Sequence, residues 1–508
     1  METSDTLLPN WLARCARNTP SHLALTCGAV RWSFADLDRE ATQLALRLVS
    51  LGVRADSRVA VLAANSVGYA VLIHALTRVG AVLVPLNVRL TQDELCWQLR
   101  DVHAEFLIHD VQYAAVATAV GTRLPELQCA TLADAASGDE VVLARLPAAD
   151  VPLRTLINLS DTHVIMYTSG TTGNPKGVVI TYGMQWWNAV GSALNLGHYP
   201  DDRWLVCTPL FHTSGLCVLI RSVINGIGVV LHKKFDPAEV NRSIREEQVS
   251  IISVVTVMLQ RMLSDLVANG IPTYPATLRC VLLGGGPAPQ PLLEECARHT
   301  IPVVQSYGLT ESCSQAVTLA PADALRKLGS AGRPLLPVQL RIVHDEHEAA
   351  PGEAGVILLK GPTITPGYDG RPEVNAATFQ NGWFSTGDLG YLDADGYLYV
   401  LDRRSDLIIS GGENVYPAEI EAVLLAHPAV EEAGVCGVED MQWGQVPVAF
   451  VHVREGYSTS AKALLAYVQQ RLARYKLPRA LYFVAPLPRT SSGKLMRREL
   501  SRLLPVQS

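Results

Sequence analysis

The chain lacks an apolar run long enough to cross a membrane, which requires about 18 uninterrupted apolar residues. Four polar or charged side chains interrupt its two most apolar windows, residues 59–86 and 205–231: His74, Arg78, His212 and Arg221. We therefore expect these windows to be core segments. The acidic N-terminus also lacks the cationic and then apolar pattern of a signal peptide, so export is not expected.

Paired cysteines and excess positive charge are missing as well. The ten cysteines are scattered singly, and none forms a Cys-x-x-Cys motif. This pattern argues against a disulfide framework or a structural zinc and is typical of a reduced, cytoplasmic protein. The net charge of −6 argues against nucleic acid or an anionic membrane as a main partner. Any phosphate-binding site must therefore be built locally.

The length of 508 residues is too great for one hydrophobic core, so two or more domains are expected. Short apolar segments such as 59–62 and 82–86 alternate with helical patterns, which predicts α/β layers with parallel strands. Near residue 355 the composition changes to short strands and glycine turns, and a smaller domain is predicted to begin at 401–405. Its patterns predict helices at 417–426 and 460–475 and strands at 432–437 and 446–453.

A stretch rich in hydroxyls and glycines, YTSGTTGNPKG, occupies residues 167–177. Hydroxyls donate hydrogen bonds to phosphoryl oxygens, glycines let backbone N–H groups approach an anion, and Lys176 adds a positive charge. The order of residues is not that of a Walker A loop, because no Ser or Thr follows the lysine. β-Branched apolar residues on both sides predict that the loop joins two strands. A mobile surface turn is the alternative.

Three further motifs carry groups that suit a nucleotide. Gly284, Gly285, Gly286 and Pro287 follow a buried strand, where a flat ligand could lie against the backbone, although a plain tight turn is the alternative. Residues 305–311, QSYGLTE, offer an aromatic face, a hydroxyl and a carboxylate able to hold Mg²⁺; the alternative is a strand end with a capping threonine. Residues 386–390, TGDLG, place a carboxylate between glycines, which suits ribose hydroxyls or an ordinary turn aspartate.

Near the C-terminus, residues 488–494, PRTSSGK, place Lys494 on a predicted turn, and a solvated basic tail is the alternative. Hydrolase chemistry is not supported. The sequence has no Gly-x-Ser-x-Gly motif, and His212 and Ser214 have no acidic third member nearby in sequence.

Taken together and in this order, the motifs resemble those of the superfamily of acyl- and aryl-CoA synthetases, luciferases and peptide-synthetase adenylation domains. The resemblance implies an α/β fold: a large N-terminal domain of layered α/β sheets with a β-barrel-like subdomain, and a small mobile α+β C-terminal domain. It places the domains at 1–402 and 403–508, with the hinge near Ser405. Many members carry an acidic residue or a lysine at that hinge position.

The resemblance also implies roles for individual residues. Tyr307 packs on adenine, Thr310 meets the α-phosphate, Glu311 binds the metal together with Thr171, and Lys494 enters the site for adenylate formation. The implied nucleotide- and CoA-side residues are Thr168, Ser169, Gly170, Thr171, Thr172, Lys176, Gly286, Pro287, Tyr307, Asp388, Arg403, Gly411 and Gly412. The implied residues around the acid are His212, which we also place in catalysis, Arg221, Gly284, Gly285, Ser306 and Gly308.

The chemistry implied is two-step ligation with ATP, Mg²⁺ and coenzyme A: a carboxylate is first converted to an acyl-AMP, and CoA then displaces AMP. A C-terminal domain that exchanges Lys494 for its 411–414 face is the expected device. Long matching runs, including 209–216 and 402–421, are similar to the o-succinylbenzoate:CoA ligases of menaquinone biosynthesis. Two alternatives stay open: a fatty or aryl acyl-CoA ligase, and an adenylation enzyme that loads a separate carrier protein. A homo-oligomer also stays open.

Arg221 receives a specific expectation within this resemblance. It lies in an otherwise apolar helical segment, nine residues after His212, where an unpaired charge is costly to bury. o-Succinylbenzoate keeps one carboxylate anionic while the other is activated, and the resembled ligases carry a basic residue at this place. We therefore expect Arg221 to recognise the benzoate carboxylate, directly or through water. The alternative is that its side chain extends to solvent or pairs with a structural carboxylate.

Overall fold

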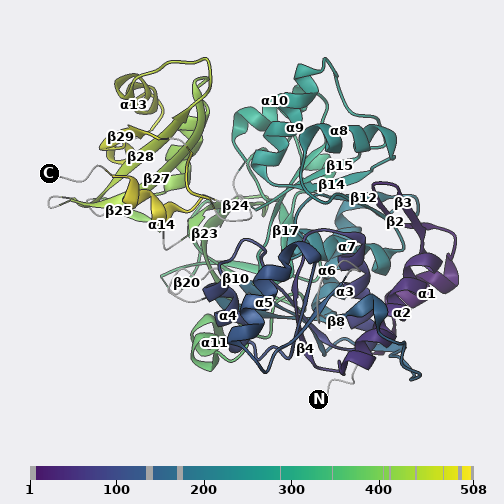
Figure 1. Ribbon diagram of the computed structural model, residues 1–508. Coiled ribbons are helices and arrows are strands. Elements are labelled where there is room, and N and C mark those ends of the chain that lie inside the picture. The colour runs from purple at the N-terminus through teal and green to yellow at the C-terminus, as the bar shows by residue number, and fades with distance from the viewer. Residues whose placement is uncertain are drawn as a thin grey trace.

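The computed structural model describes residues 7–132, 141–168, 175–285, 288–345, 347–403, 406–410, 413–440, 443–472, 474–484, 486–489 and 495–504. Helices and sheets alternate in layers, and the C-terminal elements gather into a separate unit at one side (Figure 1). This arrangement confirms the predicted α/β fold class. A short antiparallel pair, β1 (Leu7–Pro9) with β9 (Leu156–Asn158), lies near the N-terminus.

A seven-stranded sheet has the order β11-β10-β5-β4-β6-β7-β8. Its strands are β4 (Arg58–Leu62), β5 (Val82–Pro85), β6 (Phe106–His109), β7 (Gln128–Thr131), β8 (Val141–Val142), β10 (Thr162–Thr168) and β11 (Lys176–Thr181). All neighbours are parallel except β10 and β11, which are antiparallel. The glycine-rich loop therefore joins two strands, as predicted.

A nine-stranded sheet has the order β18-β17-β16-β15-β14-β12-β13-β2-β3. Its strands are β2 (Leu23–Cys27), β3 (Val30–Ser33), β12 (Arg203–Val206), β13 (Gly228–Leu231), β14 (Ile251–Val254), β15 (Cys280–Leu283), β16 (Val303–Tyr307), β17 (Val317–Thr318) and β18 (Arg333–Pro334). The six strands from β16 to β2 are parallel to one another, and the strands at the two edges pair antiparallel. Parallel strands thus form the centre of this sheet, as predicted.

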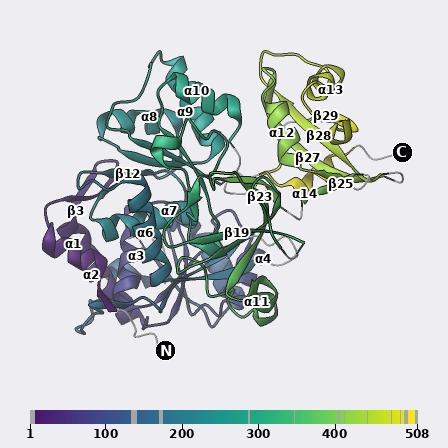
Figure 2. The same ribbon diagram turned by 180° about the vertical axis from the view of Figure 1, so that it is seen from behind.

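Eleven helices belong to the part of the chain before residue 403, as far as the structure describes it. They are α1 (Trp11–Asn18), α2 (Phe34–Leu51), α3 (Val67–Val79), α4 (Gln92–Asp101), α5 (Ala114–Arg123), α6 (Tyr182–Leu196), α7 (Thr213–Asn225), α8 (Pro237–Glu246), α9 (Thr256–Ala268), α10 (Gln290–Arg298) and α11 (Pro372–Thr378). Figure 2 shows α3, α6 and α7 in the middle of the molecule and α8, α9 and α10 together at one end.

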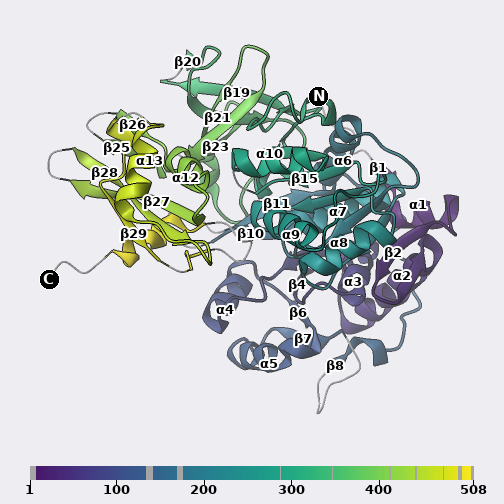
Figure 3. The same ribbon diagram turned by 90° about the horizontal axis from the view of Figure 1, so that it is seen from above.

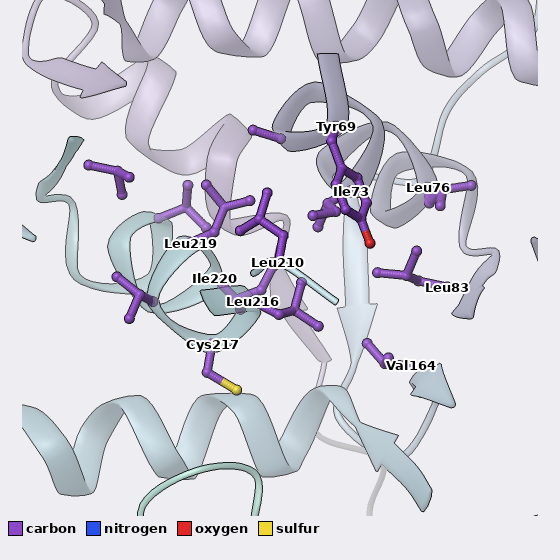
Figure 4. Packing of buried hydrophobic residues seen from close by; sticks show 14 of the residues in the cluster. Tyr69, Ile73, Leu76, Leu83, Val164, Leu210, Leu216, Cys217, Leu219 and Ile220 are labelled. Atoms are coloured by element: carbon purple, nitrogen blue, oxygen red, sulfur yellow. The ribbon is translucent and has the colours of Figure 1, made fainter. Parts of the chain in front are cut away.

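Alternating side chains show how the layers pack. In β4, Val59 and Val61 enter the large central core, whereas Ala60 and Leu62 enter a separate core with α4 and α5. In the same way, β12 sends Trp204 to the central core and its neighbour Leu205 to a core with α8 and α9. Side chains from α3, α7, β5 and β10 meet in the central core (Figure 4). The two sheets therefore enclose α3 and α7, and other helices cover their outer faces.

A six-stranded antiparallel sheet follows, where the composition predicted short strands. Its strands are β19 (Gln339–His344), β20 (His347–Glu348), β21 (Gly355–Lys360), β22 (Phe379–Gln380), β23 (Trp383–Leu392) and β24 (Leu398–Arg403). The C-terminal unit has its own sheet and core. Its elements are β25 (Ile408–Ser410), β26 (Glu413–Val415), α12 (Pro417–Leu425), β27 (Val430–Asp440), β28 (Gly444–Val453), α13 (Ala461–Gln469), β29 (Ala480–Phe483) and α14 (Arg497–Leu500).

Most predicted C-terminal elements are present, and Figure 3 shows them gathered at one side of the molecule. Helix α13 ends at Gln469, earlier than the predicted residue 475, and a short 3₁₀ turn at Arg474–Lys476 follows. Sheet membership changes between β24 and β25. The domain boundary at 402/403 stays a prediction, and Ser405 lies outside the described residues. Within the described part of the chain, no helix combines the length and apolarity that a membrane crossing needs.

Candidate active site

The carboxyl edge of the nine-stranded sheet collects several predicted residues. Gly284 and Gly285 directly follow β15, and Ser306 and Tyr307 end β16, its parallel neighbour. His212 follows β12 in the same sheet. Because parallel strands present their carboxyl ends at one edge, these residues face a common region. Open α/β sheets bind ligands at this edge, so the position agrees with the predicted substrate side.

Backbone geometry calls for glycine at two positions of this edge, Gly308 because of close packing and Gly285 because of its conformation. A Cβ atom on Gly308 would stand only 1.5 Å from the Ser314 carbonyl oxygen, so no other residue fits there. Gly285 has a φ of 84°, a left-handed conformation that glycine adopts without strain. Ser306 is fixed beside them, since its Oγ lies 3.0 Å from Thr318 Oγ1. The edge is therefore shaped by close backbone contacts.

Tyr307 and Asp388 are joined across two sheets. The Tyr307 hydroxyl donates to Asp388 Oδ2 at 2.7 Å, and Asp388 is buried in β23. Asp388 also pairs in register with Arg403 on β24, whose backbone alone is described. An aromatic face and a carboxylate at this spacing could hold a base and its ribose. The structure thus brings together three residues that were predicted to contact the nucleoside.

The predicted phosphate side includes Lys176. Thr168 and Lys176 are register partners at the ends of β10 and β11, so the loop between them is closed by a two-strand ladder. The Lys176 Nζ lies 5.3 Å from the centroid of the Tyr368 ring. The Tyr368 hydroxyl donates to Glu311 Oε1 at 2.9 Å. Glu311 and Thr310 belong to a 3₁₀ turn, η3 (Thr310–Ser312). The proposed phosphate lysine and metal carboxylate therefore contact one tyrosine.

The residues around Glu311 fit a magnesium ion held mainly by phosphate oxygens. Mg²⁺ is commonly bound through one or two carboxylates, with substrate phosphates and waters completing its shell. Glu311 supplies a single carboxylate that is 8% exposed. In the ranges that the structure describes, no group of three or more His, Cys, Asp or Glu side chains could hold a metal ion. The donor set thus suits a nucleotide-borne Mg²⁺.

His212 is placed by a fixed turn. It is the N-terminal cap residue of α7, and its ring packs against Phe211 with centroids 4.7 Å apart. The turn before it is held by Asn65, whose side chain donates to the Thr208 carbonyl oxygen and accepts from the Leu210 N–H at 2.8 Å. A buried amide with these partners leaves the turn little freedom. His212 is therefore positioned by the loop after β4 as well as by its own helix.

Arg221 lies inside the molecule, on α7. It is 2% exposed, its guanidinium carbon is 4.9 Å from the Trp204 ring centroid, and its Nη2 donates to Asn188 Oδ1 at 2.6 Å. Burial lowers the pKa of the guanidinium from its ordinary value. The amide of Asn188 in turn donates to the Gln315 carbonyl oxygen, just after η3. Arg221 thus has a structural partner, and its predicted contact with an acid stays a prediction.

Several predicted residues lie outside the described ranges: Ser169, Gly170, Thr171, Thr172, Gly286, Pro287, Ser405, Gly411, Gly412 and Lys494. Their roles stay predictions. Sequence reasoning also missed Tyr368, Asn188 and Asn65. Each of the three contacts a residue distant in sequence. The one local signal that could have pointed to any of them is that Tyr368 follows Gly367 in a turn of a strand-rich region.

Comparisons with known proteins agree with this geometry. Residues 12–369 match the model of the AMP-binding enzyme family, and residues 419–494 match that of the AMP-binding enzyme C-terminal domain. The chain is 52% identical over 505 residues to a 2-succinylbenzoate–CoA ligase of Geobacillus kaustophilus, which covers 98% of this chain and 99% of the relative.

Solved structures give the same result. The o-succinylbenzoate CoA synthetase of Bacillus subtilis, in complex with its acyl-adenylate intermediate OSB-AMP, is 44% identical with a TM-score of 0.90, over 97% of this chain and 98% of that one. The same enzyme with ATP and magnesium ion aligns equally well, over 98% and 100%. The chain therefore belongs to the AMP-binding enzyme family, and within that family it is similar over its full length to 2-succinylbenzoate–CoA ligases.

Proposed function

We propose that the protein ligates o-succinylbenzoate to coenzyme A at the expense of ATP, through an acyl-AMP intermediate and with release of pyrophosphate and AMP. The observation that carries this proposal is the 52% identity over nearly the whole of both chains. The contact of Lys176 and Glu311 with one tyrosine and the Tyr307–Asp388 pair support the proposal, because a cation, a metal-binding carboxylate and a nucleoside-binding pair are groups that adenylation needs.

In adenylation the carboxylate of the acid attacks the α-phosphate of ATP. The negative charge that develops on the phosphate oxygens must be balanced by positive charge. Lys176 supplies a positive charge at the phosphate loop, and Tyr307 with Asp388 holds the nucleoside so that the α-phosphate faces Thr310. Glu311 would hold Mg²⁺, which when bound neutralises phosphate charge and orients pyrophosphate as the leaving group. Lys494 enters on the C-terminal domain for this step, and that domain then turns its 411–414 face toward CoA.

The acid occupies the carboxyl edge of the nine-stranded sheet, bounded by His212 and by Gly284, Ser306 and Gly308. Arg221 attracts the carboxylate that is not activated, directly or through water. A cation is favoured there because an anionic carboxylate that leaves water needs a charged or hydrogen-bonding partner. The proposed partners are the acid, ATP and CoA, and we expect the protein to work in the cytoplasm.

The test is pyrophosphate release with ATP across a panel of acids: o-succinylbenzoate, benzoate, malonate and a medium-chain fatty acid. We expect o-succinylbenzoate to give the highest kcat/KM by at least about a hundredfold, since benzoate and the fatty acid lack the second carboxylate and malonate lacks the aromatic ring. Thioester formation is then measured with free CoA and with a holo carrier protein. Preference for another acid, or for the carrier, would support one of the two alternative functions.

A further inference from the structure

Tyr368 lies where two sheets meet. It belongs to the segment between β21 and α11, and this segment extends the seven-stranded sheet beyond its edge strand β11. The Asp369 N–H donates to the Gly177 carbonyl oxygen at 2.8 Å, and Tyr368 forms an antiparallel bridge with Val178. The backbone of Tyr368 is therefore held directly beside the strand that begins with Lys176.

The same segment is tied to the turn that carries Glu311. The Thr365 N–H donates to the Glu311 carbonyl oxygen at 2.8 Å, and the Thr365 hydroxyl donates to the Val179 carbonyl oxygen at 2.6 Å. Glu311 comes from the end of the nine-stranded sheet, whereas Val179 is in the seven-stranded sheet. This segment thus connects the two sheets at the nucleotide side.

The side chain of Tyr368 makes separate contacts with Glu311 and with Lys176. Its hydroxyl donates to Glu311 Oε1 at 2.9 Å, and both side chains are less than 10% exposed. Its ring lies 5.3 Å from the Lys176 ammonium. A hydrogen bond to a carboxylate in a buried place is of the stronger kind and restricts the rotation of the carboxylate. A ring beneath an ammonium attracts it electrostatically.

We infer that Tyr368 is a positioning residue for Mg·ATP: its hydroxyl orients the Glu311 carboxylate toward the metal, and its ring orients Lys176 toward the phosphates. This inference rests on the proposed function, because it takes the metal and phosphate roles of these two residues from there. The two contacts use different parts of one side chain. Substitutions can therefore remove the hydroxyl contact and keep the ring contact. A purely structural role of Tyr368 would not give separate effects on Mg²⁺ dependence and on ATP affinity.

The experiment measures ATP binding by calorimetry over a range of Mg²⁺ concentrations, without an acid or CoA, so that no turnover occurs. Tyr368→Phe keeps the ring and removes the hydroxyl. We expect the Mg²⁺ concentration for half-maximal ATP binding to rise about tenfold, with ATP affinity at saturating Mg²⁺ kept within about twofold. Tyr368→Leu should show the same rise and, in addition, lose about three- to tenfold in ATP affinity at saturating Mg²⁺.

Tyr397→Phe is the matched control. The Tyr397 hydroxyl also donates to a carboxylate, Asp323 Oδ2, at 2.5 Å, and its ring also lies near a lysine, with the Lys327 Nζ at 4.6 Å from the centroid. This variant should bind ATP with the Mg²⁺ dependence of the unaltered protein. The double variant of Tyr368→Phe and Glu311→Gln should show no larger a shift in Mg²⁺ dependence than Glu311→Gln alone.

An unchanged Mg²⁺ dependence in Tyr368→Phe, or shifts that add in the double variant, would overturn the role of Tyr368 and leave the proposed function intact. A loss of thermal stability without a change in Mg²⁺ dependence would have the same meaning. If the unaltered protein bound no ATP at any Mg²⁺ concentration, the proposed function and this inference would both be wrong.

Discussion

Arg221 donates from Nη2 to Asn188 Oδ1 at 2.6 Å, although the two residues lie on different helices, α7 and α6. Asn188 continues the link, since its Nδ2 donates to the Gln315 carbonyl oxygen at 2.7 Å. A hydrogen-bonded path therefore runs from the helix that follows His212 to the segment that follows Glu311. Substitution of Arg221 consequently tests substrate recognition and internal structure at once.

Arg221→Ala is expected to raise the KM for o-succinylbenzoate by one to two orders of magnitude, about 1.4 to 2.7 kcal/mol, and to leave the KM for ATP nearly unchanged. The reason is the loss of the one charge that we assign to the second carboxylate of the substrate. Steady-state kinetics with each substrate varied in turn measure both constants.

Asn188→Ala is the control for Arg221, because it removes the hydrogen-bond acceptor of the guanidinium and keeps its charge. It should lower the melting temperature and change the KM for o-succinylbenzoate less than Arg221→Ala does. If Arg221→Ala bound the acid normally and only lost thermal stability, Arg221 would be a structural residue.

Lys494→Ala is expected to slow adenylation about a thousandfold while thioester formation from supplied acyl-AMP continues. A charge pair about 4 Å apart at an effective dielectric near 20 is worth about 4 kcal/mol, which corresponds to that factor. The two half-reactions are measured separately, as pyrophosphate exchange and as thioester formation. Equal losses in both would assign the lysine a structural role.

Glu311→Gln is expected to weaken the Mg²⁺ dependence of pyrophosphate release, because a neutral amide is a poorer ligand for a hard cation than a carboxylate. The Mg²⁺ concentration at half-maximal rate should rise about tenfold or more. Identical Mg²⁺ titrations of the variant and the unaltered enzyme would remove Glu311 from the metal site.

His163 makes the fold sensitive to acid. Burial, and to a smaller degree the charges of His74 and Arg154, lowers its pKa from 6.5 to about 3, and its ring stacks on Tyr182 with centroids 4.3 Å apart. The unfolded chain binds a proton at this histidine below about pH 6.5, whereas the folded protein keeps it neutral. The contribution of the neutral His163 to the free energy of unfolding is therefore complete above that pH and is lost progressively as the pH falls toward 3.

At pH 5 this single histidine should cost about 2 kcal/mol of the free energy of unfolding relative to pH 7. His163→Gln should reduce the difference in unfolding free energy between these pH values by that amount, as measured by urea unfolding at both. A variant whose stability falls with pH as steeply as that of the unaltered protein would exclude His163 as the source.

Elements with strong local patterns could be predicted from the sequence. The β-branched apolar segments around the glycine-rich loop are the paired strands β10 and β11, as predicted. Motif order also assigned Tyr307 and Asp388 to one predicted site, and the two residues do contact each other although 81 positions separate them. Here the family pattern supplied a long-range relationship that local propensity does not contain.

The supporting residues could not be predicted, because their roles arise only from tertiary packing. Tyr368 contacts Glu311 across 57 positions, and Asn188 contacts Arg221 across 33. Neither belongs to a motif with a chemical signature of its own. The end of α13 was predicted too late because the apolar pattern continues past Gln469, where the helix ends.

We expect o-succinylbenzoate to be activated as its adenylate at this site, and a single-turnover experiment shows whether this intermediate forms. The enzyme, in excess over o-succinylbenzoate, is mixed with Mg·ATP, quenched and analysed by mass spectrometry, with and without a later addition of CoA. We predict that o-succinylbenzoyl-AMP and pyrophosphate accumulate in equal amounts without CoA and are converted to the CoA thioester and AMP when CoA is added. Formation of ADP, or a thioester that appears without an adenylate, would contradict the account.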